Sequence, residues 1–206
     1  MYLPSHFNYP DHARTIVQEN PLAQLISLDD AGFPFVSHLP VKLQAHTQNA
    51  ELDLLMGHLA KMNPHASYLK QRPDVLLTFM GPQAYMTPKV YPDLVRVPTW
   101  SYVAVHIKAV VRILEGEEAT DALLKQLISD HEPVYAKQWQ GLPDSYTVPM
   151  LNGIVAFEMK PISVQCKIKL NQHRPESHEA LYAQYAAGSE SEKSLAMWMR
   201  RLGMAP

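Results

Sequence analysis

The chain has 206 residues, 47% of them hydrophobic and 18% charged, which is enough to bury one sizeable core. Its 18 basic and 20 acidic residues leave a formal charge of −2, so the strongly basic balance of a domain that binds nucleic acid through phosphate contacts is excluded. No apolar run approaches the roughly 20 residues that a membrane span needs, the single cysteine excludes an internal disulfide, and no secretion signal is visible, so we expect a cytoplasmic protein.

Proline marks the boundaries of the predicted elements. There are 17 prolines against eight glycines, and each proline favours an element end, a turn or a strand edge because it fixes φ and lacks an N–H donor. The first half of the chain predicts, in order, a short helix at 11–19, a hairpin of strands 22–28 and 35–43, an apolar strand at 51–56 and a helical turn within 57–64.

The second half of the chain predicts further strands, an aromatic loop and three helices. The strands are 74–80 and 83–87, which would form a hairpin, then 102–114 and 153–170, with a proline-rich aromatic loop at 88–100. The helices are 117–131, 177–187 and a last one opened by the capping box Ser189-x-x-Glu192.

This order of elements indicates a mainly antiparallel β fold with peripheral helices. Short strands with helices between and after them favour a small barrel over a parallel sheet of repeated βαβ units. We expect one main domain over residues 1–175. Residues 176–206 are predicted to be a helical extension that packs on the barrel or on a partner subunit, because so short a helical pair is marginally stable alone.

The common catalytic and metal-binding motifs are missing. The sequence holds no nucleophile elbow, no zincin motif, no phosphate-binding glycine loop and no Cys-x-x-Cys, and its ten histidines lack the close spacing of metal ligands. We therefore predict no metal site. Cys166 lies in a predicted strand and is read as a small core residue.

His58 and Lys61 stand three residues apart after the apolar run 51–56. On one side of a helical turn that begins at a strand end, an imidazole, an ammonium group and free backbone N–H groups would suit a terminal phosphate. The alternative is a solvated lysine and a histidine that caps a loop.

Two later segments carry groups that could bind a planar, phosphorylated ligand. Trp100 could stack on a ring, although core anchoring is the commoner use of such an aromatic. Lys169, Gln172 and Arg174 gather at the predicted end of strand 153–170, where they could bind phosphate or ring heteroatoms. A solvated basic turn explains the same composition.

Several segments match one family in order and nearly end to end. They are Met1-Tyr2-x-Pro4-x-His6-Phe7, His38-Leu39-Pro40, Gly57-His58-Leu59-Ala60-Lys61-Met62-Asn63-Pro64, Gly81-Pro82-Gln83-Ala84-Tyr85-Met86-Thr87-Pro88, Pro98-Thr99-Trp100-Ser101-Tyr102 with Val105-His106, and Lys169-Leu170-Asn171-Gln172-His173-Arg174. With these motifs the chain resembles the PaiB family of FMN-binding negative transcriptional regulators.

The resemblance implies a split β-barrel like that of the pyridoxamine-phosphate oxidases, a homodimer, and FMN in the cleft between the subunits. It implies that His58 and Lys61 hold the flavin phosphate, with Asn63 in the same motif. The isoalloxazine would lie along the second strand, at His38, Leu39 and Pro40. Further groups would come from across the cleft, and these are Trp100, Lys169, Gln172 and Arg174.

The chain departs from the usual family residues at Lys61, Ser101, Asn171 and His173. Lys61 keeps the charge of the family's arginine but loses its two-pronged geometry. Weak binding of FMN, or none, is therefore among the expectations.

Three functions follow from these observations. The first is a flavin-binding regulator in which FMN changes the contacts made with a partner, although neither charge nor a recognition helix supports direct DNA binding. The second is an FMN-dependent oxidoreductase on a small substrate, in which the isoalloxazine carries the hydride. The third is a haem-binding or haem-degrading split barrel, which fold analogy allows but no histidine spacing supports.

Overall fold

The computed structural model describes residues 1–44, 54–93 and 95–206. Its strands are β1 (Leu22–Leu28), β2 (Pro34–Pro40), β3 (Lys42–Gln44), β4 (Leu54–Ala60), β5 (Asp74–Met86), β6 (Thr99–Ile113) and β7 (Ile154–Lys169). Its α-helices are α1 (Ala13–Glu19), α2 (His65–Gln71), α3 (Glu117–His131), α4 (Pro133–Gln140), α5 (Asp144–Asn152), α6 (His178–Ala186) and α7 (Glu190–Arg201). Short 3₁₀ turns are η1 (Ser5–Phe7), η2 (Pro10–His12), η3 (Pro88–Val90) and η4 (Pro175–Ser177).

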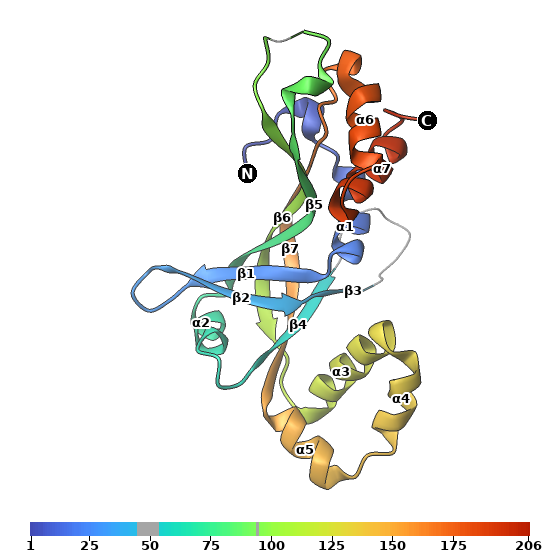
Figure 1. Ribbon diagram of the computed structural model, residues 1–206. Coiled ribbons are helices and arrows are strands. Elements are labelled where there is room, and N and C mark those ends of the chain that lie inside the picture. Colours follow the sequence, from blue (N-terminus) through green and yellow to red (C-terminus); the bar gives the residue numbers. More distant parts are fainter. Residues whose placement is uncertain (45–53, 94) are drawn as a thin grey trace. The chain divides into compact units, whose positions relative to one another are not determined.

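The seven described strands form one sheet in the order β2-β1-β5-β6-β7-β4-β3 (Figure 1). The chain divides into two compact units, one of residues 1–20, 79–106 and 164–206 and the other of residues 21–78 and 107–163. Strands β5, β6 and β7 run from one unit into the other, so each unit holds a part of all three.

In the unit of residues 21–78 and 107–163, one extended stretch of chain forms both edge strands of the sheet, β2 and β3. Strand β2 pairs antiparallel with β1 along its whole length, from Leu28↔Pro34 to Leu22↔Pro40. The Val41 N–H still donates to the Pro21 carbonyl at 2.9 Å, but Pro21 has no N–H to return a bond, so this ladder ends there. After Val41, strand β3 pairs antiparallel with β4 instead. The two edge strands of the sheet are therefore separated by one residue of the chain.

A helical insertion packs on the outer side of β4 and β7. Helices α3, α4 and α5 follow one another between β6 and β7 (Figure 1). Leu123 and Leu127 of α3 form a buried cluster with Met56 of β4 and Ala156 of β7, and Leu114 packs against it. Burial of these apolar side chains, at roughly 25 cal/mol per Å² removed from water, holds the insertion on the sheet.

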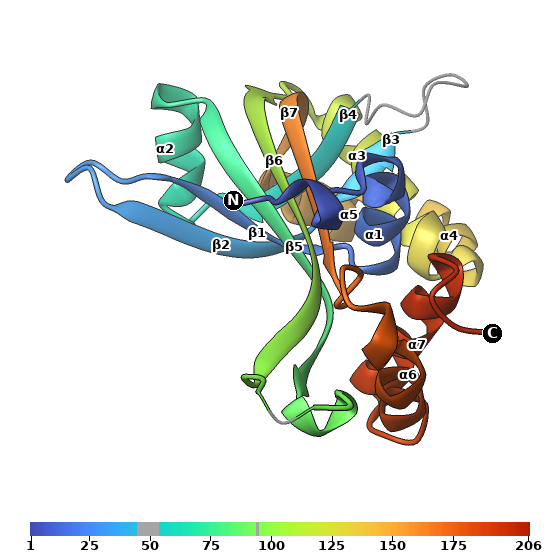
Figure 2. The ribbon, with the colours of Figure 1, turned by 90° about the horizontal axis from the view of Figure 1, so that it is seen from above.

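In the other unit, helix α7 carries the largest buried aromatic residue. Trp198 is buried and meets the ring of His12 edge-on at 5.4 Å. The helix begins at the predicted capping box, in which the Ser189 side chain accepts from the Glu192 N–H while the Glu192 carboxylate accepts from the Ser189 N–H. Helices α6 and α7 lie side by side (Figure 2). Cys166 is buried, which raises the pKa of its thiol to about 12 and leaves it unreactive.

The predicted antiparallel β fold is confirmed, as are the helix 117–131 and the strand 22–28. The predicted strand 35–43 is interrupted at Val41. The predicted strand 51–56 lies partly outside the described residues. None of the described helices is long and apolar enough to cross a membrane.

Two predictions of where the chain turns differ from the structure. The predicted hairpin at 74–87 is one continuous strand, because Gly81 allows close packing on Val103 and does not make a turn; an added Cβ would lie 3.2 Å from the Val103 Cβ. The predicted helical turn within 57–64 is wrong for residues 57–60, whereas residues 61–64 do form a turn, in which the Asn63 N–H donates to the Ala60 carbonyl at 2.9 Å. Strand β4 continues through Gly57 to Ala60, and the helix begins only at His65.

Two helices were not predicted. Pro133 stands at the first turn of α4, and Pro143 immediately precedes α5. Proline is compatible with both positions, because the first N–H groups of a helix have no intrahelical partner.

We expect Gly57→Ala to destabilise the fold by about 1 to 3 kcal/mol, because the new methyl group would overpack the interior. Its Cβ would lie 2.7 Å from the Leu39 Cδ1 and 3.4 Å from the Phe157 Cε2, both in buried side chains. Urea unfolding followed by circular dichroism measures the change. Gly141→Ala is the control, because its Cβ would meet only the Gln138 carbonyl oxygen, at 3.6 Å. Equal unfolding midpoints for the two variants would contradict this packing.

Candidate functional site

Strands β2 and β4 present part of the predicted site on one face of the sheet. Along β2, His38 and Pro40 are exposed while Leu39 is buried, as expected from the alternation of side chains along a strand. On β4, His58 lies on the same side as Met56, which carries the contact with α3. Lys42 stands opposite Met56 and donates to the Gln126 carbonyl of α3 at 3.4 Å. The outward face that starts at His38 therefore continues to the border of the helical insertion.

His58 contains a buried polar atom that the protein does not satisfy. Its Nδ1 is buried and has no hydrogen-bond partner in the described part of the chain. Burial lowers the pKa of this imidazole, so the ring is neutral at pH 7. A buried polar group without a partner costs about 1 to 3 kcal/mol, and a ligand that supplies the missing partner would recover part of that cost.

Lys61 lies in the connection between β4 and α2. Its backbone N–H donates to the Gly153 carbonyl at 2.8 Å, which ties this connection to the start of β7. Its side chain is exposed. The predicted helical relation between His58 and Lys61 is wrong because His58 is in a strand, yet the two residues still flank the end of β4.

Asn63 is held by a buried polar network that sequence reasoning missed. Its amide Nδ2 donates to the Ser37 Oγ at 3.1 Å, and its Oδ1 accepts from the His65 backbone N–H at 3.0 Å. The His65 ring is fully buried between two serines, with Nδ1 2.8 Å from the Ser37 Oγ and Nε2 2.9 Å from the Ser27 Oγ. This network fixes the connection that carries Lys61 against β2.

A signal for His65 was present in the sequence. His65 and Leu69 are four residues apart, the spacing of one helix face, and both are buried in α2. The two serine partners lie 38 and 28 residues earlier, which local spacing does not reveal. Burial between them lowers the pKa of His65 to about 4.

Trp100 and Lys169 lie in the other unit. Trp100 is 54% exposed on β6, and its ring meets that of Tyr85 edge-on at 6.3 Å. The Lys169 ammonium group donates to the Thr99 Oγ1 at 2.6 Å. Burial, and then the charge of Lys167, lowers the pKa of Lys169.

Gln172 and Arg174 follow the end of β7 in the same unit. The Gln172 amide is engaged by its own turn, since its Oε1 accepts from the Leu170 N–H at 2.9 Å and its Nε2 donates to the Ile168 carbonyl at 2.6 Å. Arg174 is exposed, with its guanidinium 3.9 Å from the Glu176 carboxylate. Neither the Trp100 aromatic group nor these basic and amide groups share a unit with His58.

Two of the departures from the family pattern have structural partners. Asn171 is buried with φ of 65°, a left-handed conformation that asparagine adopts more readily than most residues. Its amide accepts from the Tyr91 hydroxyl at 3.1 Å and donates to the Ser177 Oγ at 2.7 Å. Ser101 is buried and accepts from the Tyr185 hydroxyl at 2.8 Å. Both positions therefore support the local fold.

The ten predicted site residues thus fall into two groups. One unit holds His38, Leu39, Pro40, His58, Lys61 and Asn63, and the other holds Trp100, Lys169, Gln172 and Arg174. The first group brings together exposed strand positions, an unsatisfied imidazole and an exposed ammonium group, whereas Leu39 points into the interior. Among the described residues, no cluster of histidine, cysteine or acidic side chains could hold a metal ion.

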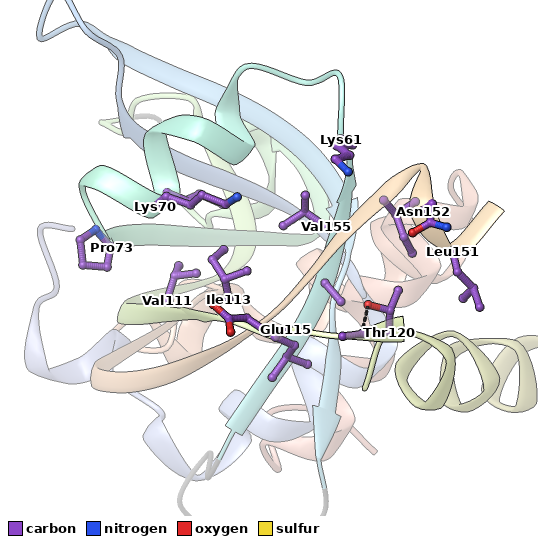
Figure 3. Close-up of a pocket in the computed structure, with 15 residues that line it drawn as sticks. Lys61, Lys70, Pro73, Val111, Ile113, Glu115, Thr120, Leu151, Asn152 and Val155 are labelled. Carbon is purple, nitrogen blue, oxygen red and sulfur yellow. Dashed lines mark hydrogen bonds between the residues drawn. The ribbon is translucent and has the colours of Figure 1, made fainter. Parts of the chain in front are cut away.

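A pocket of about 660 Å³ opens beside Lys61 (Figure 3). Its walls come from the end of α2, the end of β6, the first turn of α3, the end of α5 and the start of β7. All of these segments belong to the unit that holds His58. The volume lies within the usual range of ligand sites, about 300 to 1,000 Å³.

The amino-acid sequence is similar to those of known proteins. Residues 1–163 match the family described as "Putative FMN-binding domain". "Protease synthase and sporulation protein PAI 2" of Bacillus subtilis (strain 168) is 32% identical over 183 residues, which cover 86% of this chain and 84% of the relative.

Two solved structures share the fold. The flavocytochrome Anf3 from Azotobacter vinelandii has a TM-score of 0.62 at 14% identity, covering 78% of this chain and 67% of that chain. The FAD and heme binding protein from Mycobacterium smegmatis has a TM-score of 0.58 at 13% identity, covering 75% and 68%. At these identities the likeness concerns the fold alone. The match to the FMN-binding family rests on the sequence of residues 1–163.

We expect the stability of the protein to fall as the pH is lowered through the titration range of His65. In the unfolded chain the imidazole has its ordinary pKa of 6.5, whereas in the folded state its pKa is about 4. Between these values the unfolded state binds more protons, so folding loses about 1 to 3 kcal/mol as the pH drops from 7 to 4. Urea unfolding at several pH values measures the slope.

His65→Gln is the matched variant, because glutamine keeps a donor and an acceptor but does not titrate. Its unfolding free energy should depend less on pH than that of the unmodified protein. The same pH dependence in both proteins would show that His65 does not titrate as the buried network requires.

Proposed function

The chain belongs to the FMN-binding family matched by its residues 1–163 and is a PaiB-like flavin-binding protein; on this premise we propose that it holds FMN between two copies of itself and acts as a regulatory flavoprotein. The observation that carries the proposed site is the buried, unpartnered Nδ1 of His58, three residues before the exposed Lys61.

The residues at the end of β4 suit the phosphate of FMN. Lys61 supplies a positive charge, and the neutral His58 ring supplies a nitrogen that can donate a hydrogen bond to a phosphate oxygen. The His65 network holds the connection that carries both Asn63 and Lys61. These features support a role of this segment in holding the phosphate.

The exposed positions of β2 suit the ring system. His38 and Pro40 present an extended, solvent-accessible strand face on which a planar ring could lie. When bound, FMN supplies hydride or one-electron chemistry at its isoalloxazine ring. The protein would bind and orient the ring and limit its contact with water.

We propose that the second group of residues completes the site from a partner subunit. In the family resemblance, Trp100, Lys169, Gln172 and Arg174 approach the flavin from across a dimer cleft. The division into a barrel domain of residues 1–175 and a helical extension of residues 176–206 stays a prediction, as does packing of that extension on a partner.

The proposed regulatory role draws on the Bacillus relative, whose name refers to protease synthesis and sporulation. The formal charge of −2 argues against DNA binding by this chain alone, so regulation would act through a change in contacts with a partner. The oxidoreductase alternative stays open. Oxidation of NADPH by the FMN-loaded protein, faster than by free FMN, would favour it.

We expect Lys61→Ala and His58→Ala each to weaken FMN binding about 10-fold to 100-fold, because each removes a hydrogen bond to the phosphate dianion. Titration of FMN into the full chain, followed by flavin fluorescence and the visible spectrum, measures the affinity. Lys108→Ala is the control, since Lys108 is exposed on β6 and outside the proposed site. Unchanged affinity in both site variants would remove this assignment.

The dimer is tested separately by the oligomeric state. Sedimentation equilibrium should give a mass of twice 23.3 kDa, and Arg174→Ala should weaken FMN binding while leaving the fold intact. A monomeric protein that binds FMN with full affinity would contradict the shared cleft while keeping the phosphate site.

A further inference from the structure

The pocket beside Lys61 has walls that are fixed by backbone hydrogen bonds between distant segments. The Val111 N–H donates to the Pro73 carbonyl at 2.9 Å, and the Leu114 N–H donates to the Ala156 carbonyl at 2.9 Å. With the bond from the Lys61 N–H to the Gly153 carbonyl, three such bonds join the connection after α2, the end of β6, the start of β7 and the connection after β4. A preformed cavity loses less conformational entropy when a ligand binds.

One wall of the pocket is apolar and only partly covered by protein. Val111 and Ile113 come from β6, Val155 and Ile154 from β7, and Leu114 from the start of the insertion. All except Val111 are only half-buried. The pocket therefore offers a ligand apolar surface that the fold leaves in contact with water.

The other wall carries two ammonium groups. Lys70 lies in the last turn of α2, and Lys61 precedes that helix; both side chains are exposed. Figure 3 shows the Lys70 side chain extending from α2 toward Val155, with Lys61 at the end of β4, above Val155 in this view. Within the described residues, no carboxylate lies within salt-bridge distance of either lysine.

The first turn of α3 opens onto the same space. Its N-cap is Gly116, which lines the pocket and provides no side chain to cap the helix. The helix is 15 residues long, and the first N–H groups of such a helix carry a partial positive charge that favours anions. Two lysines and a helix start thus border one partly apolar cavity.

Glu115 limits how much negative charge a ligand in this pocket can carry. It is exposed and lines the same pocket, so the charged lining side chains are two lysines and one glutamate. Their net charge of one positive unit matches a ligand with one negative charge better than a strongly acidic one.

We propose that this pocket binds a small amphipathic monoanion, with a carboxylate held by Lys70 and Lys61 and an apolar chain on Val111, Ile113 and Val155. This pocket extends beyond the proposed flavin site, and the two sites share Lys61. The competing explanation of Lys70 is a solvated lysine at a helix C-terminus, where a cation is favoured in any case.

The test uses the full chain and octanoate as the probe, with binding followed by isothermal titration calorimetry. Octanoate should bind, while octylamine and inorganic phosphate should bind at least about tenfold more weakly, because the first has the wrong charge and the second has no apolar chain. Octylamine binding as well as octanoate would overturn the proposal.

Matched variants locate the site. Lys70→Gln should weaken octanoate binding about tenfold, and Glu115→Gln should strengthen it, because a repelling carboxylate is removed. Lys108→Gln, which loses the same charge outside the pocket, should bind octanoate as the unmodified protein does. Equal affinity in Lys70→Gln and Lys108→Gln, or weaker binding in Glu115→Gln, would overturn the assignment.

FMN titration of the same variants separates this proposal from the flavin site. Lys70→Gln should bind FMN with unchanged affinity, because Lys70 is not among the residues proposed to hold the flavin. Loss of octanoate binding with retained FMN binding supports a second site. Loss of FMN binding in Lys70→Gln, with octanoate binding retained, would overturn it by placing Lys70 in the flavin site.

Discussion

The candidate site depends on a change of pairing partner within one extended stretch of chain. Residues 34–40 bond to β1 and residues 42–44 bond to β4, with Val41 between them. Backbone N–H and C=O groups must find partners when buried. The Val41 N–H makes the last bond of the first ladder, to the Pro21 carbonyl at 2.9 Å, and Pro21 has no N–H with which to return a bond. The second ladder then begins at once, and it carries the outward face of β2 toward that of β4. This one transition positions the strand face of His38 and Pro40 and the strand end of His58 and Lys61.

Charge and hydrogen bonding are divided between different residues of the candidate site. Burial keeps the imidazoles of His58 and His65 neutral at pH 7, so they provide hydrogen bonds without charge. The positive charge comes from lysine. Lys61 stands at the border between the strand face and the pocket of α2 and α3, so an anion in either place would interact with the same ammonium group. Occupancy of one place would then influence affinity at the other, and such a coupling is reciprocal.

Local sequence signals predicted those elements whose cause is local. The alternation in 102–114 and the apolar spacing in 117–131 predicted β6 and α3, and the capping box predicted the start of α7. The failures had distant causes. Gly57 and Gly81 were read as breaks, but they accommodate Leu39 and Phe157 in one case and Val103 in the other. His65 was missed because its serine partners are in strands β1 and β2, so only the folded chain brings them together.

The pairing of β4 with β7 also bears on how the chain reaches its native state. Leu55 pairs with Met159 and Ala60 with Ile154, so this ladder joins segments about 100 residues apart, whereas the β1–β2 hairpin closes within a few residues. During synthesis, the bonding edge of β4 has no partner until the helical insertion has been made. Non-local pairing of this kind slows folding, and a strand edge left open in the meantime can recruit other nascent chains. The β4 edge that pairs with β7 is therefore left open for as long as residues 61–153 take to be synthesised.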